Sequence, residues 1–140
     1  MKIHFIPSPE RIREGGDNGN GYLDSTEFIT TAGTVNGPTL PEAVQGPCAV
    51  KFPDSGDVYL IGGRTYSSDY TSKVWVANPS NEYASFTPGP SMMTARYYHG
   101  CSTMSIGTKS IIVTAGGFNG NYLASVEILD PLSNQWVAGK

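Results

Sequence analysis

The side chains of this sequence that could bind another molecule collect in two loops that each follow a double glycine, and in the segment 92–98. Arg and aromatic residues recur there, and Arg and Tyr are enriched at the energetic hot spots of protein interfaces. Loops display such side chains at the surface. We therefore predict a partner-binding surface made of Arg64, Tyr66, Tyr70, Arg96 and Phe118. For Arg96, the sequence supports a structural link between neighbouring units as strongly as a partner contact.

A calcium-binding loop is the sharpest alternative chemistry. With Glu27 as the last ligand of an EF-hand loop, Asn18, Asn20 and Asp24 fall at ligand positions. The first position is then Gly16, which has no carboxylate, and the flanking segments show no helical pattern. We expect no calcium site here, although the sequence leaves this question open.

The cysteines and histidines do not complete a metal site. His99 and Cys101 project to the same side of a predicted strand, but neither His4 nor Cys48 has a spacing that completes a tetrahedral set. Cys48 and Cys101 occupy equivalent places in adjacent units. Facing sheets lie about 10 Å apart, whereas a disulfide requires Cα atoms within about 7 Å. We therefore predict two buried free thiols, no metal and no cofactor.

Signatures of catalysis and of polyanion binding are absent from the sequence. It holds no Gly-x-Ser-x-Gly motif, no phosphate loop and no carboxylate pair in an apolar setting. The 12 acidic and 9 basic residues give a net charge of -3, with no run of Lys or Arg. The apolar runs are far shorter than the roughly 18 residues of a membrane span. We expect no enzyme, no nucleic-acid partner and no membrane partner.

The candidate residues belong to a repeated framework. Gly62 and Gly116 each open a double glycine and are 54 positions apart, and Cys48 and Cys101 are 53 apart. The shared offset indicates structural units of about 50 residues. We predict a degenerate or partial repeat at 1–33, a repeat at 34–86, and a repeat at 87–140 that ends in the linker to a further unit.

Each unit is predicted to consist of β-strands. β-Branched and aromatic residues concentrate in short runs, and no run keeps the 3.6-residue period of a helix. Residues 58–61 are apolar on both faces, so neighbouring units must cover both faces. Four short strands per unit favour a β-propeller, whose blades surround a central channel. Trp75 lies within such a strand, which favours packing between blades.

The third unit resembles a kelch repeat. Its matching positions are a double glycine after an apolar strand, a Leu-x-Ser-x-Glu set, an Asp-Pro pair and Asn-x-Trp, here Gly116-Gly117, Leu123, Ser125, Glu127, Asp130-Pro131, Asn134 and Trp136. The second unit has Tyr83 where Trp is expected and lacks the Leu-x-Ser-x-Glu set. The resemblance implies an all-β fold, an incomplete kelch-type β-propeller built of four-stranded antiparallel blades, with binding loops after the second strand and between blades.

The resemblance also implies a function in binding. We expect a non-enzymatic module of adaptor or scaffold type that presents its loops to a protein or peptide, with self-association through open blade faces. The alternative is an internal piece of a secreted propeller that binds carbohydrate or acts as a galactose-oxidase-like copper enzyme. The copper ligands of such an enzyme are superficially similar to Tyr97, Tyr98, His99 and Cys101 of this sequence. Two cysteines and no N-glycosylation signal favour the cytoplasm, with an extracellular location as the alternative.

Overall fold

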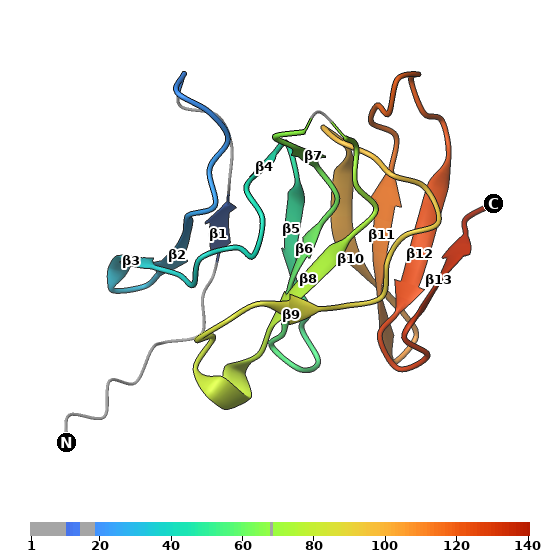
Figure 1. Ribbon diagram of the computed structural model, residues 1–140. Helices are drawn as coiled ribbons and strands as arrows, with labels where there is room; N and C mark the ends of the chain where they lie inside the picture. Colours follow the sequence, from blue (N-terminus) through green and yellow to red (C-terminus); the bar gives the residue numbers. More distant parts are fainter. Residues whose placement is uncertain (1–10, 15–18, 68) are drawn as a thin grey trace.

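The computed structural model describes residues 11–14, 19–67 and 69–140 of the chain (Figure 1). Within them the secondary structure is β, apart from a short 3-10 turn at Pro79–Asn81. The first blade is a sheet of β1 (Arg11–Glu14), β2 (Thr26–Thr30) and β3 (Gly33–Asn36). The second contains β5 (Cys48–Lys51), β6 (Val58–Ile61), β8 (Val74–Ala77) and β9 (Thr87–Pro88). The third contains β10 (Gly100–Ile106), β11 (Lys109–Ala115), β12 (Val126–Asp130) and β13 (Gln135–Ala138).

The blades stand side by side in chain order, and the paired strands within each blade are antiparallel (Figure 1). Two short strands, β4 (Val44–Gln45) and β7 (Arg64–Thr65), pair with each other. This pairing joins the segment that precedes the second blade to the loop after β6. The predicted all-β architecture of an incomplete propeller is confirmed, with four-stranded antiparallel sheets in the second and third blades and three strands in the described part of the first. The first two predicted units end at residues 33 and 86, where β3 and β9 begin. These two strands close the sheets of the first and second blades, so each closing strand lies next to a predicted boundary.

The apolar strand β6 divides its side chains between two hydrophobic cores. Val58 and Leu60 pack with Phe28 of the first blade, whereas Tyr59 and Ile61 pack with residues of the third blade. All four side chains of β6 are buried. The prediction that neighbouring blades cover both faces of this strand is therefore confirmed. Trp75, on β8, packs against the core that includes Phe28, as expected for a residue between blades.

Trp136 and Tyr83 were expected to be equivalent, but they anchor different segments. Trp136 on β13 donates its indole N–H to the Pro90 carbonyl at 2.7 Å, so it fastens the segment that enters the third blade. Tyr83 lies before β9 and donates its hydroxyl to the Gly56 carbonyl at 2.9 Å, within its own blade. Its ring also packs on Phe28, with 5.6 Å between the centroids, so Tyr83 joins the first two blades.

The two cysteines form a disulfide, so the prediction of free thiols was wrong. Cys48 on β5 and Cys101 on β10 have Cα atoms 6.1 Å apart, which is within the range that a disulfide spans. The expectation used the spacing of stacked sheets, about 10 Å. In a propeller the blades converge towards the central axis, and β5 and β10, the first strands of their blades, are in direct contact. The bond thus links two blades covalently.

In the part of the chain that the structure describes, no helix has the length and apolar character needed to cross a membrane.

Removal of the disulfide should destabilise the chain under oxidising conditions. The bond closes a loop of 53 residues, and restricting the unfolded chain in this way contributes about 4 kcal/mol. We expect the double variant Cys48→Ser/Cys101→Ser to lose about that much free energy of unfolding in urea titrations without reductant. With dithiothreitol, wild type and variant should unfold at the same urea concentration. Equal stability of the two proteins without reductant would show that the bond stabilises nothing.

Candidate functional site

A cavity of about 500 Å³ lies at the edge of the second and third blades. It lies where the loop after β11 meets the segment that joins the two blades. The loop after β11 is at the top of Figure 1. Aromatic side chains dominate its lining. We call it the aromatic groove, and its lining residues are Tyr97, Tyr98, Gly117, Phe118, Tyr122 and Leu123.

Main-chain hydrogen bonds fix the two sides of the groove to each other. Tyr97 and Phe118 exchange both of their N–H···O bonds at 3.0 Å, which makes an isolated antiparallel bridge. The Leu123 N–H closes the loop by donating to the Gly117 carbonyl at 2.9 Å. Gly117 has φ +89°, and a Cβ there would lie 2.7 Å from the Tyr97 oxygen, so only glycine lets the two segments approach. This explains one glycine of the repeated pair.

Tyr98 is held in a backbone conformation that residues other than glycine rarely adopt. Its φ is +49°, and its N–H donates to the Gly46 carbonyl at 2.9 Å. The Tyr97 and Tyr98 rings lie 4.3 Å apart, and both crowd Gly46, where a Cβ would be 2.7 Å from the Tyr98 ring. Tyr98 nevertheless stays 64% exposed. Strained residues of this kind cluster at binding sites, where the surrounding structure maintains them.

A second layer of side chains supports the groove from the loop after β6. The Tyr70 ring contacts Tyr97 and Phe118 at centroid distances of 5.6 and 5.7 Å. The Arg64 guanidinium carbon lies 5.5 Å from the centre of the Tyr70 ring, a cation–π contact. Among the described residues, no carboxylate forms an ion pair with Arg64. The groove therefore has an uncompensated positive charge beside it.

The structure brings together three of the five residues predicted to contact a partner. Arg64, Tyr70 and Phe118 lie in or beside the aromatic groove. Tyr66 is 77% exposed, and its ring contacts the Tyr22 ring on the side of the first blade, with 5.9 Å between the two centroids. Tyr66 as a binding residue stays a prediction.

Sequence reasoning placed three lining tyrosines in the predicted binding segments 92–98 and 118–122 but did not name them as contacts. Tyr97 and Tyr98 were considered only as copper ligands, although they lie in the predicted binding segment 92–98. Tyr122 lies in the loop after the second double glycine, like Phe118, and is 92% exposed. The same loop-and-aromatic criterion that selected Phe118 would have found Tyr122.

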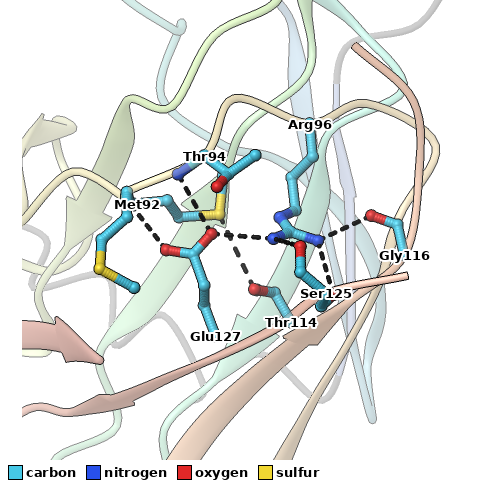
Figure 2. Close-up of polar contacts among 8 residues, drawn as sticks. Met92, Thr94, Arg96, Thr114, Gly116, Ser125 and Glu127 are labelled. Atoms are coloured by element: carbon cyan, nitrogen blue, oxygen red, sulfur yellow. Dashed lines mark hydrogen bonds and ion pairs between the residues drawn. The ribbon is translucent and has the colours of Figure 1, made fainter. Parts of the chain in front are cut away.

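The prediction that Arg96 contacts a partner was wrong, because the Arg96 side chain is completely buried. It donates to the Gly116 and Ser125 carbonyls at 2.8 and 3.1 Å, to the Ser125 hydroxyl at 3.0 Å, and to Glu127 at 2.9 Å (Figure 2). A buried charge needs such partners, because desolvation is costly. Arg96 thus has the alternative role, a structural link to the neighbouring blade.

Glu127 fastens the same segment from its other end. Its carboxylate accepts the N–H groups of Met93 at 2.6 Å and of Thr94 at 3.2 Å, in addition to Arg96 (Figure 2). The Ser and Glu of the Leu-x-Ser-x-Glu set are therefore the residues that hold the segment between blades. On the opposite side, the Arg96 carbonyl accepts the Gly63 N–H at 2.9 Å, so the segment is bonded to both blades.

Cys101 is not free to act as a copper ligand, as the alternative hypothesis required. The Cys101 sulfur is bonded to Cys48. His99 is buried, and within the described residues neither ring nitrogen has a hydrogen-bond partner. Burial, followed by the nearby positive charge of Arg96, lowers the pKa of His99 to about 4. His99 therefore packs as a neutral ring between the blades.

The calcium hypothesis also loses its geometric basis. Glu27 lies within β2 and pairs with strands on both sides, so no exiting helix follows it. Gly16 and Asn18 lie outside the described residues. Within the part of the chain that is described, no group of three or more Asp, Glu, His or Cys side chains is arranged to hold a metal ion.

A second cavity, of about 620 Å³, lies at the opposite edge among the hairpin turns. Its carboxylates already have partners: Asp54 accepts a hydrogen bond from Ser110 at 2.9 Å, and Asp57 accepts one from Asn78 at 2.6 Å. Its cation Lys109 pairs with Asp130. These polar groups serve to join turns, which leaves the aromatic groove as the candidate site.

Comparison with known proteins identifies the repeat. The family model of the Kelch motif matches residues 95–140, which include the third blade and the Arg96 segment. No curated protein matches the chain. The predicted kelch resemblance is thus confirmed, and the chain contains a propeller-type module of a kind that commonly binds proteins.

The low pKa of His99 predicts a specific pH dependence of stability. Because the pKa is near 4 in the folded protein and 6.5 in the unfolded chain, the unfolded chain binds more protons between these values. The free energy of unfolding should therefore fall by about 3 kcal/mol as the pH is lowered from 7 to 4. We expect His99→Gln to lack this contribution. Urea titrations across this pH range measure the difference in free energy of unfolding between the two proteins, in which the contributions of their shared carboxylates cancel. Parallel pH profiles of wild type and variant would contradict the assignment to His99.

Proposed function

We propose that this chain is a non-enzymatic binding module that takes a peptide segment of a partner protein in the aromatic groove. The observation that carries the proposal is the exposure of Tyr98 and Tyr122, 64% and 92%, beside a cavity of about 500 Å³. Large rings left in water beside a concave surface mark an interaction site, because covering them is favourable. The cavity falls within the size range of ligand pockets.

The arrangement suits tight binding at low entropic cost. Tyrosine rings offer a large contact area with few rotatable bonds, and the bridge between Tyr97 and Phe118 holds the main chain beneath them. Arg64 beside the groove can form a charge-assisted hydrogen bond with a carbonyl or carboxylate of the partner. Arg and Tyr are the residue types in which binding energy concentrates.

The carbohydrate-binding alternative is supported by the same rings, since sugars also stack on aromatic faces. A sugar, however, needs polar side chains for its hydroxyls, and among the described residues that line the groove only the tyrosine hydroxyls are polar. The copper-enzyme alternative rested on Tyr97, Tyr98, His99 and Cys101, and the disulfide removes Cys101 from that set. We therefore place peptide binding ahead of both.

The disulfide changes the proposed compartment. The expectation of a cytoplasmic protein rested partly on few cysteines, taken as free thiols. A bond between Cys48 and Cys101 persists in oxidising compartments and is rare in the cytosol. We propose that the chain works in an oxidising compartment, which was the alternative location.

Self-association through open blade faces is a second part of the proposal. On the third blade, Met104 and Val137 are 52% and 51% exposed. Fully burying a side chain of this size contributes about 1.5–3 kcal/mol, and covering a half-exposed one about half as much. A second copy of this chain is the occupant we propose, and this part stays a prediction.

Selection from a random peptide display library tests the binding function. Peptides retained by the wild-type chain are then titrated against Phe118→Ala and Tyr122→Ala. We expect each variant to lose about tenfold in affinity, equivalent to about 1.4 kcal/mol, because each removes a ring of the groove. Tyr122 is 92% exposed, so its truncation leaves the fold intact.

Leu132→Ala provides the matched control, because Leu132 is also apolar and 88% exposed but lies at the edge of the second cavity. Its affinity for the same peptides should equal that of wild type. Selected peptides that bind Tyr122→Ala and wild type equally would place binding elsewhere and contradict the proposal. A glycan array and a copper titration of the same sample would support the alternatives if either ligand bound stoichiometrically.

A further inference from the structure

We infer that the occupant of the aromatic groove is a proline-rich segment in the polyproline II conformation, an inference that rests on the proposed function. The groove is lined by Tyr97, Tyr98, Phe118 and Tyr122, and none of its described lining residues carries a charge or a side-chain amide. Such a surface matches a ligand with apolar rings and hydrogen-bond acceptors. Polyproline II segments dock in aromatic-lined grooves for this reason.

The rings of the groove form two contacting pairs. Phe118 and Tyr122 meet edge to face, with centroids 5.3 Å apart and planes at 67°. Tyr97 and Tyr98 lie 4.3 Å apart with planes at 39°. The rings of each pair are in contact, so the pyrrolidine rings of the ligand pack in the cavity of about 500 Å³ that both pairs line. The tyrosine hydroxyls can donate to the peptide carbonyls of such a segment, which are fully exposed because polyproline II has no internal hydrogen bonds.

An extended β-strand is a poorer occupant of this groove. Strand addition needs a row of unpaired main-chain groups. Here the Tyr97 and Phe118 N–H and carbonyl groups are bonded to each other, and the Leu123 N–H is bonded to Gly117. The groove therefore recognises a ligand through side chains. A proline-rich segment suits this arrangement, since it has few N–H groups of its own to satisfy.

A cationic ligand is disfavoured by charge. An aromatic cage attracts a positive group through its ring faces. In this groove the Tyr70 ring that supports Tyr97 and Phe118 already carries the Arg64 guanidinium, 5.5 Å from its centre. A second cation would be repelled by Arg64 and would meet no carboxylate in the described lining. The uncharged proline-rich segment complements the surface, and acidic residues flanking it would be attracted to Arg64.

Fluorescence polarisation of labelled octaproline with the full chain tests the inference. We expect saturable binding of octaproline and none of an equally long Gly-Ser peptide. Tyr122→Ala should weaken binding about tenfold, and Tyr122→Phe, which keeps the ring and loses the hydroxyl, by about threefold. Leu132→Ala is the control, because Leu132 is 88% exposed and lies at the second cavity, away from the groove. It should bind octaproline as wild type does.

The outcomes separate this inference from the function beneath it. If octaproline fails to bind while library peptides without proline bind and are lost in Tyr122→Ala, the proline inference is overturned and peptide binding stands. If a trimethyl-lysine peptide binds and octaproline does not, the charge argument is wrong. If no peptide of any kind depends on Tyr122, both the inference and the proposed function fail.

Discussion

The buried ion pair of Arg96 and Glu127 is the interaction on which the arrangement of the second and third blades depends. Arg96 is bonded to the second blade through its main chain, at Gly63, and to the third blade through its guanidinium. Both charged side chains are almost entirely removed from water. An isolated charge there would be strongly unfavourable, and breaking such a pair by removing one partner costs about 3–5 kcal/mol. The segment between the blades is therefore held in a single arrangement.

The aromatic groove inherits its geometry from this pair. Tyr97 follows Arg96 directly, and its main chain pairs with Phe118 in the loop after β11. Glu127 fixes the beginning of the same segment at Met93 and Thr94, and the Gly46 carbonyl receives the Tyr98 N–H. The rings are thus positioned before any ligand arrives. A preorganised site avoids the entropic cost of ordering its own side chains on binding.

Local pattern was enough to predict the scaffold. The apolar run of β6 requires cover on both faces whatever the neighbours are, so the face-to-face packing of blades followed from four residues. The double glycines marked the ends of strands, and the structure shows that Gly117 permits the close approach of Tyr97. The kelch resemblance relied on residues that hold the blades together, Ser125 and Glu127 among them, which is why it predicted the fold.

The predictions failed where distance in space decided the outcome. The disulfide depends on how far blades converge at β5 and β10, which sequence spacing does not encode. Arginine is a residue type that is common at interfaces, so sequence favoured a partner contact for Arg96. Its buried position between the blades depends on Glu127, which is 31 residues later in the sequence. The lining tyrosines come from two segments about 20 residues apart, which the fold brings together through the main-chain bridge of Tyr97 with Phe118 and the hydrogen bond from Arg96 to Gly116.

Hydrogen exchange of the Tyr97 and Phe118 amides in Arg96→Lys tests most directly whether the buried pair holds the groove. Lysine keeps the charge but cannot reproduce the forked contacts with Gly116, Ser125 and Glu127. The account predicts that both amides exchange at least about tenfold faster in this variant than in wild type, with the β6 amides unchanged. Lys73→Ala, which removes the exposed ion pair with Glu42, should leave the groove amides at their wild-type rates. Unchanged protection of Tyr97 and Phe118 in Arg96→Lys would contradict the account.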